Sequence, residues 1–118
     1  MFLKLNHKNL DAYKASRVLM KECYRISLLL PQDEKFNMVS QIRRAALSVK
    51  LNLAEGSSRK SSIERKRYYE ISRGSIVELD AAFEAAVDLN YLNEEQVRDL
   101  TAPINNSFAL ITNLINAK

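Results

Sequence analysis

The chain has 118 residues, a formal net charge of +4, only two glycines and two prolines, and 47% hydrophobic residues. This length fits one domain over residues 1–118, and the scarcity of glycine and proline favours an all-α protein over a sheet protein. No apolar run approaches the ~20 residues of a membrane span, and a single cysteine, Cys23, excludes an internal disulfide. We therefore expect a cytoplasmic protein without a membrane partner.

The first predicted helix covers about residues 9–29 and follows an N-terminal arm at residues 1–8. Apolar and small residues recur at spacings of four and three, which is typical of a helix with one buried face. Pro31 ends this helix, because the residue before a proline is pushed out of the helical region. The core stripe consists of Ala12, Ser16, Leu19, Cys23, Ile26 and Leu30.

The second predicted helix begins between Asp33 and Asn37 and covers about residues 35–55. Gly56 is expected to close it in the left-handed conformation that glycine adopts easily. Its core stripe consists of Val39, Ile42, Ala46, Val49 and Leu53.

The third predicted helix covers about residues 62–90 and begins with a capping box formed by Ser61 and Glu64. Gly74 lies inside it, where glycine costs ~1 kcal/mol relative to alanine. Two interpretations stay open for Gly74: the close approach of a neighbouring helix, or a tolerated surface glycine. Ile71, Ile76 and Phe83 widen the core stripe, which consists of Tyr68, Ser72, Ser75, Leu79, Ala82, Ala86 and Leu89.

The fourth predicted helix covers about residues 94–116 and begins with Asn93 and Gln96 at capping-box spacing. Pro103 predicts a kink or short break near residues 100–102, because it removes a hydrogen bond and crowds the preceding turn. The stripe consists of Val97, Leu100, Ile104, Phe108, Ile111 and Ile115. Short loops between long helices predict an antiparallel up-down-up-down four-helix bundle.

Patterns that would indicate an enzyme are missing from the sequence. His7 is the only histidine and Cys23 lies on a core stripe, so a Cys-His nucleophile pair is not expected. Two isolated glycines do not form a phosphate-binding loop, and the Glu-x-x-His pairs of a di-iron bundle are absent. We therefore expect a non-enzymatic protein without a cofactor or a metal.

Charge is distributed unevenly along the chain. Residues 41–73 carry nine Lys and Arg against three Asp and Glu, whereas residues 74–118 carry two against seven. This asymmetry indicates an anionic partner such as RNA or DNA, self-association of oppositely charged ends, or simply solvated helix faces with local ion pairs. The candidates for nucleic-acid contact are Arg43, Lys50, Arg59, Lys60, Arg65, Lys66 and Arg67.

The second helix also carries a polar arc. On a helical wheel this arc lies apart from the core stripe, and Leu47, Leu51 and Ala54 form a smaller apolar strip beside it. Two apolar strips on one helix predict two buried contacts, one inside the bundle and one against another subunit. The alternative is an ordinary solvent-exposed face on which Leu47 and Leu51 are exposed singly. The polar arc consists of Gln41, Arg44, Ser48, Asn52 and Glu55.

The strings QIRRAALSVKLNLAEGSSR and YYEISRGSIVELDAAF resemble a known family, the four-helix-bundle proteins encoded in intervening sequences of bacterial 23S ribosomal RNA genes. That family shows a Gln-x-x-Arg, Ser, Asn-Ile-Ala-Glu-Gly progression and later a Gly-Ser-x-x-Glu-Leu element. The resemblance covers about residues 10–92, although Lys50 stands where proline is common and Asn37 where glycine is common. The matching residues are Gln41, Arg44, Ser48, Asn52, Leu53, Ala54, Glu55, Gly56, Gly74, Ser75, Glu78 and Leu79.

The resemblance implies an antiparallel bundle that assembles into a ring-shaped homopentamer. The chain is also similar to the accessory protein of diversity-generating retroelements, a basic pentameric barrel that works with a reverse transcriptase and binds nucleic acid. We therefore expect an oligomeric RNA-binding protein, with the matching residues organising assembly. The alternative is a structural or protein-interaction module whose partner is another protein. We also expect Arg44 or Asn52 to meet Glu78 or Ser75.

Overall fold

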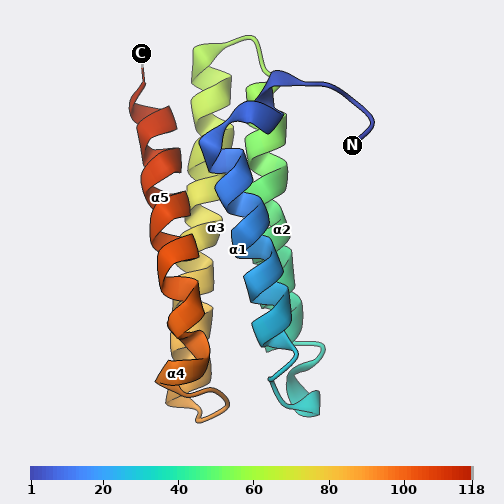
Figure 1. Ribbon diagram of the computed structural model, residues 1–118, viewed down its shortest axis with the longest axis vertical. Helices are drawn as coiled ribbons and strands as arrows, with labels where there is room; N and C mark the ends of the chain where they lie inside the picture. Colours follow the sequence, from blue (N-terminus) through green and yellow to red (C-terminus); the bar gives the residue numbers. More distant parts are fainter. Residues whose placement is uncertain (118) are drawn as a thin grey trace.

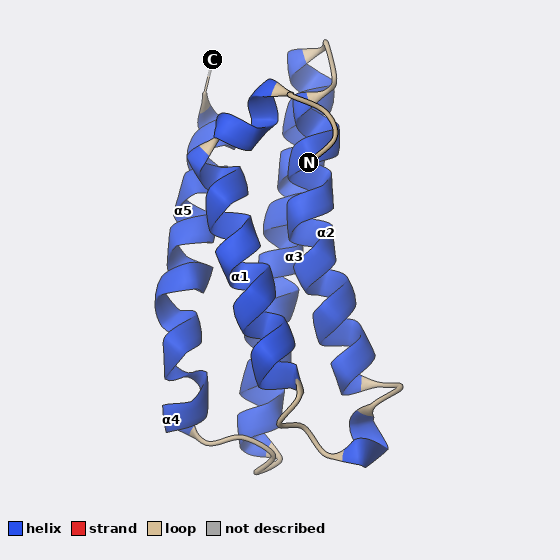
Figure 2. Cartoon of the chain, turned by 45° about the vertical axis from the view of Figure 1, so that its right-hand side comes forward, coloured by secondary structure: helices blue, strands red, loops and turns tan. Residues whose placement is uncertain are grey.

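Four long helices lie side by side in the computed structural model, which describes residues 1–117 (Figures 1 and 2). They are α1 (Asp11–Ser27), α2 (Met38–Ser57), α3 (Ser62–Asp88) and α5 (Thr101–Asn116). The short elements are η1 (Asn6–Asn9), η2 (Gln32–Glu34), α4 (Glu94–Val97) and η3 (Arg98–Leu100). Residues 1–117 contain no strand, so the prediction of an all-α protein is confirmed.

The core lies where the four long helices meet. Helix α2 packs against α1 and α3, and α5 packs against α3 and α1. Each helix contributes a fully buried side chain, namely Leu19, Ile42, Leu79 and Ile111. Burying one such side chain contributes about 1.5–3 kcal/mol, so the amphipathic faces stabilise the bundle.

The predicted core stripe of α1 is confirmed, since all six of its members are buried. Helix α2 begins at Met38, later than predicted. Pro31 leads into the short helix η2, and Asn37 takes a non-helical conformation with φ −124° and ψ −92°. These residues delay the first turn of α2, and Val39 is consequently only half-buried.

The predicted stripe of α3 is wrong at both ends. Tyr69, 7% exposed, is buried in place of the half-buried Tyr68, and Leu89 is exposed. A straight helix has 3.6 residues per turn, so a four-three repeat drifts by about 20° per heptad. Over the 27 residues of α3 this drift carries the ends of the predicted stripe away from the core. Ile76 and Phe83 are buried as predicted, whereas Ile71 is 45% exposed.

Gly56 does not close α2 in a left-handed conformation, because it lies inside the helix and has no positive φ. It is buried against the beginning of α3. A Cβ atom at this position would lie 2.8 Å from Cβ of Tyr68 and 3.2 Å from the carbonyl oxygen of Arg65. Gly56 therefore allows α2 and α3 to approach closely. A Cβ atom at Gly74 would meet nothing within 4 Å, so within one chain Gly74 is a surface glycine.

The predicted break in the last helix is present as the 3₁₀ segment η3. It ends at Leu100, so Pro103 falls in the first turn of α5, where a missing N–H removes no helical hydrogen bond. The capping box before α4 is confirmed, with Asn93 and Gln96 exchanging hydrogen bonds of 2.8 and 2.9 Å.

Phe108, predicted to be in the core, is 40% exposed. A 3₁₀-helix has fewer residues per turn than an α-helix, so η3 changes the angle about the helix axis between the side chains before and after it. A helical wheel drawn for one continuous α-helix therefore places Phe108 on the wrong face.

Candidate nucleic-acid interface and assembly seam

The connection between α2 and α3 gathers five of the seven predicted nucleic-acid contacts at one end of the bundle. Helix α2 ends at Ser57 and α3 begins at Ser62, so the connection is short and its basic residues are neighbours. Figure 1 shows this turn at the end of the bundle where the N-terminal segment lies. We call this group the basic turn: Arg59, Lys60, Arg65, Lys66 and Arg67.

Two of these cations hold the turn together. Arg59 Nη2 lies 2.7 Å from Glu55 Oε1 and donates to Tyr68 Oη at 3.0 Å, while its guanidinium covers the Tyr68 ring. Tyr68 and Glu55 raise the pKa of Arg59. Arg65 Nη1 donates to the carbonyl oxygens of Arg59 at 3.0 Å and Lys60 at 2.6 Å. Arg59 and Arg65 are therefore engaged within the chain.

The other three cations of the basic turn are better placed to meet an anion. Lys60 and Arg67 are exposed, and Lys66 is half-buried. Because Arg59 and Arg65 fix the turn, these side chains project from an ordered backbone.

The structure places Arg43 and Lys50 away from the basic turn. Arg43 Nε donates to Ser27 Oγ at 3.0 Å, and its guanidinium lies over the Tyr24 ring. It therefore fastens α2 to α1. Lys50 lies with Nζ 5.7 Å from the centre of the Tyr13 ring.

Sequence reasoning missed the contribution of η1, which packs against α1 and α2. The His7 ring contacts Tyr13 edge-on at 4.8 Å between centroids, on the same ring that Lys50 covers. Burial and the positive charge of Lys8 lower the pKa of His7. Residues 6–8 belong to the predicted N-terminal arm, and Asn9 was predicted to begin the first helix; Lys8 Nζ donates to the carbonyl oxygen of Leu3. Residues 1–8 contain two lysines and one histidine, and these gave no signal for this packing.

The polar arc of α2 meets α3 through a hydroxyl network. Ser75 Oγ donates to Ser48 Oγ at 2.8 Å, and Asn52 Nδ2 donates to the same oxygen at 2.9 Å. Asn52 therefore meets Ser75 through Ser48 rather than directly. Nearby, Ser72 Oγ donates to the carbonyl oxygen of Val49 at 2.7 Å inside the core. The charged motif residues and Gln41 lie outside this network and are exposed: Gln41, Arg44, Glu55 and Glu78.

An apolar surface flanks this network. Leu47 is 38% and Leu51 57% exposed on α2, and Ile71 is 45% exposed on α3. Gly74 lies three residues after Ile71, hence on the same side of α3, beside Ser75. We call this surface the α2–α3 strip: Leu47, Leu51, Ile71 and Gly74. Within one chain the strip stays open to solvent.

The described residues offer little for catalysis or metal binding. Residues 1–117 contain no group of three or more His, Cys, Asp or Glu side chains that could hold a metal ion. Cys23 is fully buried, and desolvation together with the charge of Glu22 raises the pKa of its thiol to about 12. None of the helices in this part of the chain has the length and apolar character needed to cross a bilayer.

The sequence and the fold of this chain were compared with those of known proteins. A family model described as 23S rRNA-intervening sequence protein matches residues 8–113. A crystal structure of a protein of unknown function from the S23 ribosomal protein family of Bacteroides thetaiotaomicron has a similar fold, with a TM-score of 0.81 and 19% sequence identity. The alignment covers 90% of this chain and 99% of that one. Among curated proteins, none matches.

Proposed function

Because this chain belongs to the 23S rRNA-intervening sequence protein family, we propose that it is a non-enzymatic, oligomeric, cytoplasmic protein that binds RNA through the basic turn. The observation that carries the proposal is the presence of the exposed Lys60 and Arg67 on a turn braced by Arg59 and Arg65. Cations of this kind bind phosphates without regard to sequence.

The proposal includes assembly into a homopentameric ring. The exposed α2–α3 strip supports a contact between subunits, because Leu47, Leu51 and Ile71 would lose their contact with water there. A ring would repeat the basic turn around an axis, so weak single contacts with one RNA would add by multivalency.

The proposed ring uses an antiparallel, up-down-up-down bundle as its subunit. Two observations support this order. Consecutive long helices pack against each other, and the connection between Ser57 and Ser62 is too short for two parallel neighbours of this length.

The test is binding of a fluorescent single-stranded RNA over a series of salt concentrations. We expect affinity to fall as salt rises, and the double variant Lys60→Gln/Arg67→Gln to bind more weakly. Each phosphate contact removed should lower the salt slope by about 0.7. The control is Lys21→Gln, which removes an exposed cation from α1.

Three results would contradict RNA binding: no binding at low salt, affinity that ignores salt, or equal losses in the control and the double variant. An oligomer that binds no RNA at low salt but binds a specific protein would support the alternative, a structural or protein-interaction module. The open α2–α3 strip is the observation that favours this alternative.

A further inference from the structure

A groove runs between α3 and α5, on a different side of α3 from the α2–α3 strip. It consists of two adjoining cavities of about 280 and 230 Å³, which share Asp80, Ile104 and Asn105. We call them together the α3–α5 groove. Phe83 and Leu100 line the larger cavity, and Phe108 lines the smaller one. The floor of the groove is therefore mainly apolar.

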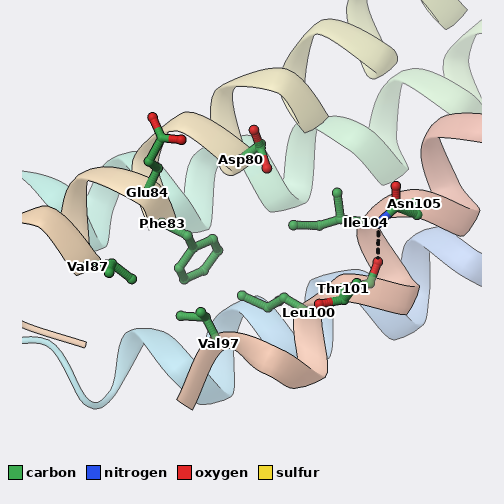
Figure 3. A pocket seen from close by; sticks show the side chains of 9 residues that line it. All are labelled: Asp80, Phe83, Glu84, Val87, Val97, Leu100, Thr101, Ile104 and Asn105. Carbon is green, nitrogen blue, oxygen red and sulfur yellow. Dashed lines mark hydrogen bonds between the residues drawn. The ribbon is translucent and has the colours of Figure 1, made fainter. Parts of the chain in front are cut away.

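The rim of the groove is acidic. Asp80 and Glu84 lie one turn apart on α3, are both exposed, and border the larger cavity. Figure 3 shows both carboxylates along the α3 edge, above the inward-pointing Phe83 and Leu100. None of the described residues lining either cavity is Lys or Arg. Arg73 lies over Phe108 and donates to Thr112, so the nearest α3 cation is already engaged.

The shape of the groove favours side chains of a polypeptide over a small molecule. Each cavity is smaller than the ~300 Å³ at which pockets for drug-sized ligands begin. The two cavities adjoin along the helices, so a segment lying across them can place apolar side chains in both while a basic side chain reaches the rim.

The same chain contains a segment of this chemistry. Residues 1–5 are the part of the predicted N-terminal arm that precedes η1, and from here on we call only these residues the arm. They include Phe2, 90% exposed, and Leu5, 45% exposed. Lys4 lies between them and is exposed, and residues 1–10 contain no acidic residue. The arm is therefore apolar and basic, where the groove is apolar and acidic.

The arm cannot fill the larger cavity of its own chain. Five residues span at most about 18 Å when fully extended, whereas the molecule is 44 Å long. Figure 1 shows the arm at the end of the bundle opposite α4, and the larger cavity is lined by Val97 of α4. An arm that occupies this groove therefore comes from a second copy.

We propose that the arm of one copy docks in the α3–α5 groove of a second copy, with Phe2 and Leu5 on the apolar floor and Lys4 beside Asp80 and Glu84. This contact goes beyond the proposed function, because it involves neither the α2–α3 strip nor the basic turn. It accounts for the apolar residues that the arm exposes in a single chain. The groove and the arm lie at opposite ends of the bundle, so each copy can donate to one neighbour and accept from another.

The test is disulfide formation between two different variants of the full chain. Leu3→Cys is mixed with Asn105→Cys at tens of micromolar under mild oxidation, and the joined peptides are identified by mass spectrometry. Native Cys23 does not compete, since it is fully buried. The control mixes Leu3→Cys with Val18→Cys, which places an exposed thiol on α1. We expect the Leu3–Asn105 link to form at least tenfold faster than the control link.

Charge reversal gives the second measurement. Asp80→Lys/Glu84→Lys in the Asn105→Cys protein should slow linkage at least tenfold, and Lys4→Glu in the Leu3→Cys protein should restore it. Equal linkage to Asn105 and Val18, or linkage that ignores the charge reversal, would overturn the proposal. Leu51→Asp and Lys60→Gln/Arg67→Gln should leave the linkage unchanged. Failure of the ring or of RNA binding is thus distinguishable from failure of arm docking.

Discussion

Gly56 offers a sharp test of how α2 and α3 pack, because Gly74 provides a matched control on the facing helix. Both glycines lie inside helices, so replacing either with alanine gains helix propensity of about 0.8–1 kcal/mol. The two sites differ in the space that they offer. An alanine Cβ at Gly56 would lie 2.8 Å from Tyr68 Cβ, whereas one at Gly74 would meet nothing within 4 Å.

The contacts at Gly56 cannot be relieved by turning a side chain. Tyr68 Cβ is attached directly to the backbone of α3, and the Arg65 carbonyl oxygen, at 3.2 Å, is part of that backbone. Relief requires α3 to move away from α2, and overpacking of this kind costs about 1–3 kcal/mol. After the gain in propensity, we expect Gly56→Ala to lower the free energy of unfolding by about 0–2 kcal/mol and Gly74→Ala to raise it by about 1 kcal/mol.

The assay is urea unfolding followed by circular dichroism, with both variants in a Leu51→Asp background and at equal protein concentration. This background removes the proposed subunit contact, which would otherwise contribute to apparent stability by mass action. Equal midpoints for Gly56→Ala and Gly74→Ala would refute the close approach of α2 and α3 at Gly56.

Three further predictions concern the hydroxyl network, the α2–α3 strip and the buried thiol. Ser48→Ala removes the hydroxyl that Ser75 and Asn52 share, while each keeps a second bond, to the carbonyl oxygens of Ile71 and residue 48. We expect urea unfolding to show a loss of about 0.5–1.5 kcal/mol; an unchanged midpoint would contradict this. Leu51→Asp should lower the molecular mass in solution without changing helix content, and an unchanged mass would contradict the subunit contact. Because burial raises the pKa of the Cys23 thiol from its ordinary value of 9.0 to about 12, stability should fall as pH rises above about 9. Cys23→Ala should flatten that decline, measured by thermal unfolding, and an equal decline in both proteins would contradict the assignment.

Much of the fold could be predicted from the sequence because the apolar spacing reports directly on buried faces. The stripe of α1 is buried along its whole length, and Ser61 accepts a hydrogen bond from the Glu64 N–H at 3.3 Å, which is one of the two bonds of the predicted capping box. The wrong predictions concern residues whose conformation is decided by packing between helices rather than by the neighbouring sequence. The sequence around Gly56 is typical of a helix end. In the structure, however, the absence of a Cβ atom at Gly56 is what lets α2 approach Tyr68 of α3.

The candidate site was predictable in composition but not in geometry. The sequence reveals a basic segment, but only the structure separates Arg59 and Arg65, which bond within the turn, from the exposed Lys60 and Arg67. Arg43 is a further example, because its bond to Ser27 depends on how α1 and α2 pack. The groove between α3 and α5 was beyond prediction for the same reason, since it forms between helices whose register the sequence does not specify.

Ring assembly and RNA binding are tested together by the molecular mass in solution, measured by light scattering with and without single-stranded RNA. A ring predicts five times the 13.5 kDa of one chain without RNA. RNA at low salt should increase that mass, and high salt should return it to the value of the free ring. A mass of one chain at tens of micromolar, unchanged by RNA at low salt, would contradict the account.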